Sequence, residues 1–399
     1  MDARRFFSLG LAASLAGLSS LACSSLGAES GPGEILVLDY NVKSLFDDQE
    51  AGSEYSDFSI AKGRWDGPRY RRRLEKLAEV VLAASPKTKG PDIVCLEEIE
   101  NASVLEALRK GPLAEARYRS AAIVPVPGQA IASAVLSRYP ITELRTHATA
   151  LGGPEGRYLL ELAFDVEGRR LRGFVCHWKS KVEGAAATEA ARREASSLLS
   201  RRVSSLLGAE PGAELFVCGD FNENPDEYRR VGRRYLTALF PEGEAGSLPE
   251  AAEALLVADE PEGAGLKRGA GTAARLALFS PWASSGGYSY VHKEERERID
   301  GFLLAPGLLD GLGLSFASFA VLDSDFLLDA EGRPKAWSAA SPEGYSDHLP
   351  LLLRLSVGKE RNSAPKKRRP RSPGCADFPR RARFASGRRG NSPGRAPRR

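Results

Sequence analysis

Short apolar runs alternate with amphipathic stretches from Glu34 to Val357, and this alternation limits the possible folds more than any other feature of the sequence. Alternation of this kind is typical of β-sheets that are covered by helices. The clearest strands are predicted at 35–40, 92–96, 132–137, 159–166, 171–177, 215–219 and 349–355.

Two of the intervening stretches predict covering helices, because apolar side chains recur on one helical face. In residues 70–84 these side chains are Leu74, Leu77 and Val81. In residues 188–207 they are Ala191, Ala195, Leu198 and Leu206. Residues 248–283 are rich in Ala, Gly and Glu and only weakly periodic, so we expect a partly ordered excursion that holds one helix.

Polar side chains gather at the ends of the predicted strands. They are Asn41, Glu98, His177, Asp220 and Asn222 after strands, Asp300 within RIDGFLL, and Asp347 with His348 before the last strand. One acidic residue after a strand is usually a turn former or a helix cap. Six strand ends that share carboxylates, amides and two imidazoles instead indicate one cleft.

This set of side chains suits phosphodiester cleavage, which needs charge neutralisation, a positioned water and stabilisation of the leaving oxygen. Carboxylate and amide oxygens bind Mg²⁺ or Mn²⁺ well, and Asn41, Glu98 and Asp347 fit that task. An imidazole held by a carboxylate fits proton transfer, and His348 with Asp300 is the preferred pair. His177 is a second imidazole for a phosphate oxygen or the leaving group.

The segments LDYNVKSLFD, DIVCLEEIEN, CHWKSK, CGDFNENPD, RERIDGFLL and SDHLPL resemble, in this order, the signature blocks of the endonuclease/exonuclease/phosphatase superfamily. They are similar in particular to its bacterial extracellular-nuclease-like branch, whose blocks read NV-x-x-LFD, QE-x-EN, HWKS, GDFN, RID and SDH-x-P. The six blocks span residues 35–355, which is most of the chain.

The resemblance implies an α/β (α+β) fold, a four-layer αββα sandwich of two mixed β-sheets with the site at one edge between them. It assigns metal contact to Asn41, Glu98 and Asp347, with Mg²⁺ as the expected ion and Mn²⁺ or Ca²⁺ as alternatives. The expected domain covers residues 30–358.

The same resemblance implies the catalytic roles. Asp220 would position or activate the attacking water, and His348 would be the acid/base that Asp300 orients. His177 would stabilise the transition state. Substrate contacts are implied for Asn222, to a phosphate oxygen, and for Arg157, near the substrate phosphate.

The sequence departs from the family pattern at two positions. Glu97 replaces the usual Gln beside the metal carboxylate, which adds negative charge unless the side chain points elsewhere or binds a second ion. Gly301 replaces the common bulky residue after Asp300. Both differences concern specificity, because the expected metal and imidazole residues are all present.

The charge of the chain is divided unevenly. Residues 359–399 hold fifteen Lys/Arg against two acidic residues, a net +13, which leaves −9 for the rest of the chain. An acidic body does not suit a protein that grips long stretches of nucleic acid by charge alone. The tail, rich in Arg, Pro, Ser and Gly, is expected to be disordered. A basic arm for nucleic acid or acidic lipid and an accidental extension both fit its composition.

The N-terminus predicts export. Arg4 and Arg5 precede an apolar run that is too short to span a bilayer comfortably, so residues 1–22 are expected to be a signal peptide. Ser20–Cys23 resembles a lipoprotein processing site, in which Cys23 would carry the lipid. Plain cleavage with a bystander cysteine is the alternative, so the protein is expected to be a cell-envelope lipoprotein or secreted.

The remaining cysteines and histidines predict little chemistry. Cys95, Cys176 and Cys218 lie in apolar strand-like runs and are expected to be buried core residues. His147 and His292 are expected to be solvated surface residues. Trp178 is expected either to stack on a base or to pack in the core.

Three functions fit the sequence. The first is an exported, metal-dependent nuclease that acts as a monomer on DNA or RNA. The second keeps the chemistry but acts on a phospholipid headgroup or an inositol phosphate, because one fold hosts many substrates. The third is a non-catalytic surface binding protein, against which the complete set of costly charges argues.

Overall fold

A computed structural model of the chain describes residues 33–149, 157–249, 252–267, 275–338 and 342–360. The chain divides into two units, Met1–Arg361 and Asn362–Arg399, and the second lies outside the described residues. The expected signal peptide and almost all of the expected basic tail also lie outside them. Among the described residues, no helix is long and apolar enough to cross a membrane.

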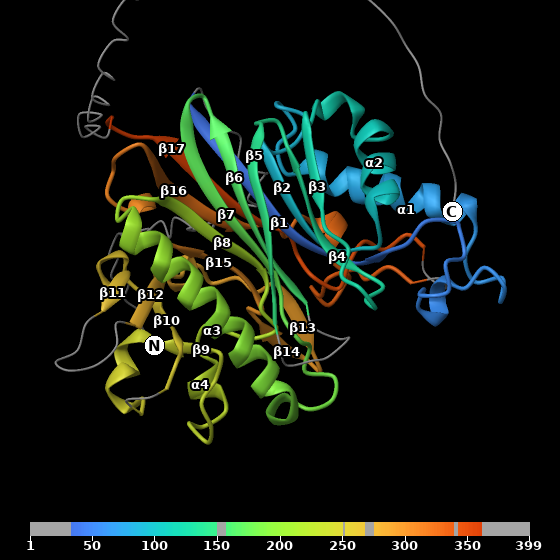
Figure 1. Ribbon diagram of the computed structural model, residues 1–399. Helices are drawn as coiled ribbons and strands as arrows, with labels where there is room; N and C mark the ends of the chain where they lie inside the picture. The colour runs from blue at the N-terminus through green and yellow to red at the C-terminus, as the bar shows by residue number, and fades with distance from the viewer. Residues whose placement is uncertain (1–32, 150–156, 250–251, 268–274, 339–341, 361–399) are drawn as a thin grey trace, which may run out of the picture. The chain divides into compact units, whose positions relative to one another are not determined.

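The described residues form two large mixed sheets (Figure 1). The six-stranded sheet runs in the spatial order β16 (Leu314–Val321), β17 (Leu351–Val357), β1 (Glu34–Leu45), β2 (Ile93–Ile99), β4 (Ala132–Ser137) and β3 (Ser120–Ile123). The nine-stranded sheet runs β5 (Ile141–Ala148), β6 (Tyr158–Val166), β7 (Arg169–His177), β8 (Glu214–Asp220), β15 (Asp300–Leu304), β12 (Arg275–Phe279), β10 (Leu255–Ala258) and β9 (Leu239–Pro241), with β11 (Gly265–Lys267) beside β12.

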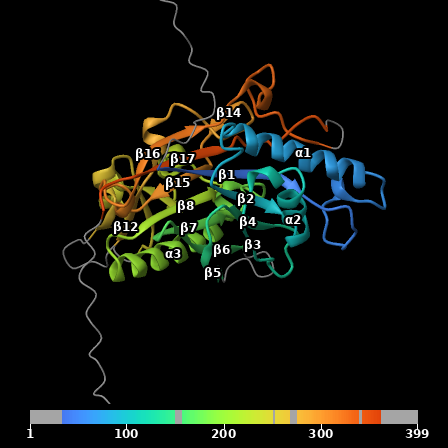
Figure 2. The ribbon, with the colours of Figure 1, turned by 90° about the horizontal axis from the view of Figure 1, so that it is seen from above.

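Helices cover the outer face of each sheet, so that four layers result (Figures 1 and 2). Helices α1 (Gly67–Ala83) and α2 (Ala102–Lys110) pack on the six-stranded sheet, and α3 (Ala185–Ala209) packs on the nine-stranded sheet. A short helix, α4 (Glu227–Arg230), and a hairpin of β13 (Tyr290–His292) and β14 (Glu295–Glu297) lie outside these layers. The predicted αββα sandwich is therefore confirmed.

Alternation along the strands builds the two kinds of core. In β1, Ile35 and Val37 belong to the cluster between the sheets, whereas Leu36 and Leu38 belong to the cluster under the helices. Successive side chains of a strand point to opposite faces, and strands buried on both faces are apolar throughout. This alternation explains why the predicted strands appeared as continuous apolar runs.

All seven predicted strands and both predicted helices form, but the inward face of one helix differs in part from the predicted face. In α3 the predicted Leu206 is buried and the predicted Ala191, Ala195 and Leu198 are half-buried, whereas the neighbouring Arg192 and Leu199 are fully buried. The prediction counted apolar side chains only, so a buried arginine could not contribute to it.

The helix predicted within residues 248–283 does not appear in the described part of this region. In the part of this region that the structure describes, β10, β11 and β12 add strands to the nine-stranded sheet, and the helical pieces are short 3-10 turns. These strands are three to five residues long, which is too short for a periodic pattern to emerge from the Ala- and Gly-rich sequence.

Candidate active site

Three neighbouring strands of the nine-stranded sheet each place one polar residue in the same row. In the parallel pair β7 and β8, His177 lies opposite Asp220. In the antiparallel pair β15 and β8, Asp300 lies opposite the same Asp220. Their side chains continue the inward alternation of Val175, Cys218 and Phe302, so the row faces the other sheet. Sequence positions far apart thus meet because strand register aligns them.

The approach of β7 to β8 requires a glycine immediately before Asp220. A Cβ at Gly219 would lie 1.9 Å from the carbonyl oxygen of Cys176, and the residue has a φ of +130°. A side chain at this position would force β7 and β8 apart and separate His177 from Asp220.

A backbone irregularity in the six-stranded sheet brings Glu98 into the site. Asn41 pairs with Glu97 and Leu45 pairs with Ile99, so three residues of β1 face the single residue Glu98 of β2. Lys43, Ser44 and Glu98 all adopt the left-handed conformation, with φ of 54°, 60° and 68°. Such conformations are costly for residues other than glycine and tend to occur at functional sites.

Asn41 joins the two sheets at this point. Its amide nitrogen donates to Oε1 of Glu98 at 3.2 Å and to Oδ2 of Asp220 at 3.1 Å. Its oxygen accepts from the backbone N–H of Lys43 at 3.0 Å, and the Ser44 hydroxyl donates to Oε2 of Glu98 at 2.7 Å. The structure therefore brings together Asn41, Glu98 and Asp220.

His348 is held by Asp300. Its Nδ1 lies 2.8 Å and 3.0 Å from the two carboxylate oxygens, and both residues are buried. The ring of Tyr290 covers the imidazole, with ring centroids 4.7 Å apart. Burial opposes the imidazolium charge, but Asp300 and then Asp347 and Asp220 outweigh it and raise the pKa of His348 to about 10.

Asp347 lies on the open side of the cluster, where its side chain is 32% exposed. The Nζ of Lys43 lies 3.1 Å from its Oδ2, and the Nε2 of His348 lies 3.9 Å from its Oδ1. Burial acts to raise the pKa of Asp347, but the charges of His348 and Lys43 prevail and lower it. The neighbouring Ser346 hydroxyl donates to the carbonyl oxygen of Asn41, which ties Asp347 to β1.

His177 has a different environment. Its Nδ1 lies 2.6 Å from Nη1 of Arg157, and its Nε2 lies 3.8 Å from Oε1 of Glu98 and 3.7 Å from Oδ2 of Asp220. Burial, and then the positive charges of Arg157 and His348, hold the pKa of His177 well below its usual range. The expected substrate residue Arg157 thus contacts an expected catalytic residue.

Asn222, which follows β8, adopts the left-handed conformation. Its hydrogen bonds hold neighbouring residues of the site in place. Its amide nitrogen donates to the carbonyl oxygen of Trp178 at 3.2 Å, and its backbone N–H donates to Oδ1 of Asp220 at 2.8 Å. Trp178 packs against Phe221 with centroids 4.9 Å apart and is buried, which makes it a core residue.

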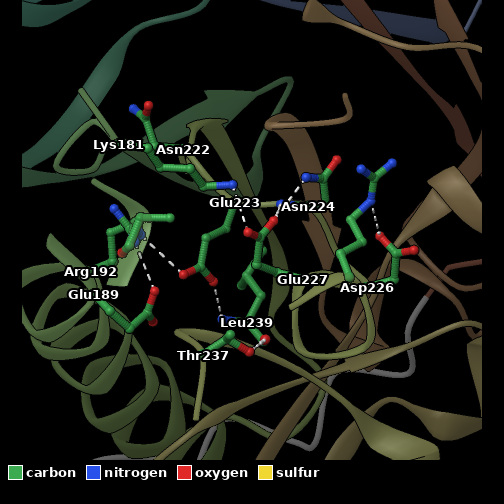
Figure 3. A network of polar contacts seen from close by, with 12 residues as sticks. Lys181, Glu189, Arg192, Asn222, Glu223, Asn224, Asp226, Glu227, Thr237 and Leu239 are labelled. Carbon is green, nitrogen blue, oxygen red and sulfur yellow. Dashed lines mark hydrogen bonds and ion pairs between the residues drawn. The ribbon is translucent and has the colours of Figure 1, made fainter. Parts of the chain in front are cut away.

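A network of ion pairs lies beneath the loops that follow β7 and β8 (Figure 3). Arg192 of α3 is fully buried and donates to Glu223 at 3.0 Å, to Glu189 at 2.8 Å and to the carbonyl oxygen of Lys179 at 3.1 Å. Lys181 pairs with Glu227 at 2.8 Å. The network fixes the segment after His177 to the segment after Asp220. The apolar periodicity of the sequence did not predict this network.

Glu97 lies in the space between the sheets, where the charges of Asp300 and Asp220 act on it. Glu97 is fully buried near Asp39. The side-chain oxygens of both residues are buried without a hydrogen-bond partner. Burial is the main cause that raises the pKa of both groups well above the usual range. The replacement of Gln by Glu97 therefore adds a buried acid below the site and no charge at its mouth.

The other departure from the family pattern also has a packing reason. A Cβ at Gly301 would lie 3.3 Å from Phe221 and 3.4 Å from Nε1 of Trp282. The same Nε1 donates to the carbonyl oxygen of Asp300 at 2.8 Å. Trp282 and Phe221 thus occupy the space around this position.

Two histidines outside the site differ from each other. His292 is exposed on the β13–β14 hairpin, as expected. His147 was expected to be a solvated surface residue, but it is half-buried and its Nε2 lies 2.7 Å from buried Glu161. Glu161 keeps the alternation of its own strand. It meets His147 because of how the two strands are aligned, and this alignment cannot be read from the sequence. Cys95, Cys176 and Cys218 are free and buried, as expected.

The donor set at the cleft fits a hard divalent cation. Carboxylate oxygens of Glu98 and Asp220 meet at the amide of Asn41, and Asp347 adds a partly exposed carboxylate. Asp220, Asp300 and His348 also offer ligand atoms within 4.8 Å of one another. We favour the oxygen donors, because Nδ1 of His348 is already engaged by Asp300 and hard cations prefer oxygen.

Several solved structures resemble this chain at low sequence identity. A truncated TDP2 of Caenorhabditis elegans is 14% identical, with 81% of this chain and 98% of that chain covered and a TM-score of 0.48. A TDP2 of D. rerio complexed with single strand DNA product is 15% identical, with 81% and 99% covered and a TM-score of 0.45. An endonuclease/exonuclease/phosphatase family protein of Bacteroides thetaiotaomicron is 14% identical, with 81% and 98% covered and a TM-score of 0.46. Likeness at this level does not indicate a substrate.

The match of the sequence to a protein family says more about this chain than the solved structures do. No curated protein matches the chain. The family described as "Endonuclease/Exonuclease/phosphatase family" matches residues 36–238, which is just over half of the chain and runs from β1 to the segment before β9. The chain therefore belongs to the endonuclease/exonuclease/phosphatase family of metal-dependent phosphoester hydrolases.

Proposed function

We propose that the protein is an exported nuclease, which hydrolyses phosphodiester bonds of DNA or RNA with a divalent cation, most simply Mg²⁺. One observation carries the proposal: carboxylates from both sheets meet at one point, between two imidazoles that are held in different ways. A hydrolytic site of this class needs an acidic cation site, a positioned water and a proton donor or acceptor.

The proposed metal residues are Glu98, Asn41 and Asp347. A divalent cation, when bound, supplies charge neutralisation at the phosphoryl oxygens and lowers the pKa of bound water. Asn41 holds Glu98 and Asp220 in place through its amide, and rotation of that amide would present its oxygen instead. Asp347 is paired with Lys43, so the lysine balances its charge when no substrate or cation is near.

The proposed reaction uses the nine-stranded sheet for its proton chemistry. Asp220 orients the attacking water, and burial followed by the charge of Asp300 raises the pKa of Asp220 to about 7. His348 transfers the proton while Asp300 fixes its ring. His177 donates to a phosphate oxygen as charge develops there, and Asn222 holds a second phosphate oxygen.

Nucleic acid is the proposed substrate because the motif blocks resemble those of the extracellular-nuclease-like branch. A phospholipid substrate would favour an exposed apolar hairpin beside the site. In the described part of the chain, the exposed large apolar side chains are scattered. The hairpin that carries Tyr290 has charged residues at 293–298 instead.

The direct test is a substrate panel. Mature protein would be incubated with plasmid, linear DNA, RNA, sphingomyelin and inositol phosphates, each with Mg²⁺, Mn²⁺ or chelator. The proposal predicts that nucleic acid is cut only when metal is present and that Asp220→Ala abolishes the cutting. Cleavage of sphingomyelin or inositol phosphate alone would transfer the proposal to the lipid or inositol class.

The proposal of export rests on the N-terminal segment, which lies outside the described residues. We propose that Cys23 carries a lipid after removal of residues 1–22, so that the protein is anchored to a membrane through that lipid. Substitution Cys23→Ala should move the protein from the membrane fraction to the soluble fraction of the producing cell. An unchanged distribution would favour simple secretion or another anchor.

A further inference from the structure

The contact between Arg157 and His177 determines more than the position of an arginine. Arg157 directly precedes β6, and the antiparallel ladder of β6 and β7 brings Leu160 opposite Val175. Arg157 and His177 lie just beyond the end of this ladder, and Nη1 of Arg157 is 2.6 Å from Nδ1 of His177. Neither the family motifs nor the proposed reaction assigns a role to this contact.

The chemistry of the two groups fixes the direction of the hydrogen bond. A guanidinium has five N–H donors and no acceptor, and it stays protonated in proteins. At 2.6 Å its partner nitrogen must accept, so Nδ1 of His177 presents a lone pair. A neutral imidazole has one N–H, which therefore lies on Nε2.

The surroundings favour this neutral form of the ring. His177 is buried, and it shares an apolar-walled pocket with Arg157, Val124 and Ile131. Protonation of Nδ1 would direct an N–H at the guanidinium and place two positive charges side by side in this setting. Nε2 faces Oε1 of Glu98 at 3.8 Å and Oδ2 of Asp220 at 3.7 Å, which is the proposed metal and water side of the cleft.

We propose that Arg157 is a positioning residue that locks His177 in its Nε2–H tautomer, so that His177 is a fixed neutral donor toward the substrate phosphate. His177 then neither takes nor gives a proton, and proton transfer belongs to His348 alone. The part that concerns the phosphate rests on the proposed function. The tautomer itself does not, because it follows from the contact with Arg157.

This role differs from the direct phosphate contact that the family resemblance implies for Arg157. An arginine that binds the phosphate in both the ground state and the transition state contributes to affinity, and its loss raises KM. An arginine that acts through the tautomer of His177 contributes to the transition state, and its loss lowers kcat.

The first test observes the tautomer without substrate or metal. The chain has four histidines, so ¹⁵N-histidine labelling gives a spectrum that variants can assign. The account predicts that His177 carries its proton on Nε2 in the wild type. In Arg157→Met the ring should populate both tautomers, whereas Arg157→Lys, which also only donates, should restore the Nε2–H form. Arg145→Met, at an exposed arginine of β5, is the matched control and should leave the spectrum unchanged.

A proton on Nδ1 of wild-type His177 would overturn the proposal, and so would an unchanged His177 signal in Arg157→Met. Thermal unfolding of each variant shows whether it is folded. Because this test uses neither substrate nor metal, absence of nuclease activity would sink the proposed function and leave the tautomer lock in place.

The second test separates the two roles of Arg157 by kinetics. Arg157→Met should lower kcat by about tenfold or more with KM little changed, since one donor at a developing charge contributes at least this much. Arg157→Lys should recover much of the loss. A raised KM with unchanged kcat, equally in both variants, would show a direct phosphate contact and contradict the positioning role.

Discussion

The two imidazoles of the site lie on either side of Asp220 and are held in opposite ways. His348 is gripped by the carboxylate of Asp300, which stabilises the imidazolium, whereas His177 is gripped by the guanidinium of Arg157, which stabilises the neutral ring. One residue type thus has two electrostatic states in one cleft. Both rings are buried, so the partner at Nδ1 distinguishes what the Nε2 of each ring can do.

Removing the proton-transfer side should have the largest effect. His348→Ala should lower turnover by on the order of 10² or more, because no other imidazole in the described cleft has its Nδ1 hydrogen-bonded to a carboxylate. Asp220→Ala should be similarly severe. The measurement is kcat on the preferred nucleic acid, with circular dichroism to show that each variant is folded. A wild-type rate in either variant would refute the site assignment.

Breaking the grip on His348 while keeping its ring should cost less. Asp300→Asn preserves the shape of the side chain but removes the charge that raises the pKa of His348. We expect turnover to fall by roughly 10-fold to 10²-fold, since the ring loses its orientation and its charge stabilisation. Asp329→Asn, at an acidic residue outside the cleft, is the control. An Asp300→Asn enzyme as fast as the wild type would remove the contrast between the two imidazoles.

Replacing the ring of His177 should have a smaller effect than replacing the ring of His348. His177→Gln keeps an N–H donor where Nε2 of His177 lies, but it cannot transfer a proton. We expect it to retain more activity than His348→Gln, with a loss of about tenfold. Equal losses in the two glutamine variants would mean that both rings transfer protons and that their different partners have no consequence for the chemistry.

The smallest effect is expected for Glu97→Gln, a substitution in the core between the sheets. Glu97→Gln restores the residue that is usual in the family block and removes a buried acid that lacks a satisfied partner. Because the folded pKa of Glu97 is raised, its contribution is most favourable below the unfolded pKa of about 4.3 and is lost as pH rises. The variant should therefore be more stable by about 1 kcal/mol at neutral pH, with a smaller gain near pH 4.

Urea unfolding of the wild type and Glu97→Gln at both pH values measures this difference. A variant that is less stable at neutral pH would show that the carboxyl has a stabilising partner. Turnover should change little, because Glu97 is fully buried and makes no hydrogen bond to a residue of the site.

The sequence predicted the fold well because strand alternation and strand-end chemistry are local signals. His177, Asp220 and Asp300 were predicted to meet, and their alignment follows from register that each strand's inner face fixes. Glu98 is a different case. Strict alternation would place Glu97 inward and Glu98 under the helices, and only the irregularity opposite Lys43 and Ser44 turns Glu98 to the cleft.

Other features could not be predicted because they depend on buried charge. The inward face of α3 is set partly by Arg192, whose partners include Glu223 after β8 and the carbonyl oxygen of Lys179 after β7. The contact of Arg157 with His177 depends likewise on how β6 and β7 end. Apolar periodicity is silent on polar groups that are buried by pairing, so such contacts appear only when the chain is folded.

We propose that carboxylates of both sheets form one metal-dependent hydrolytic centre. Its most direct test is the Mg²⁺ dependence of bis(4-nitrophenyl) phosphate hydrolysis in the wild type and in Glu98→Gln, because this substrate requires no recognition beyond the phosphodiester. The account predicts activity that chelator abolishes and a Glu98→Gln variant that needs at least tenfold more Mg²⁺ for half-maximal rate. Hydrolysis that persists in chelator, or an identical Mg²⁺ curve for both proteins, would contradict it.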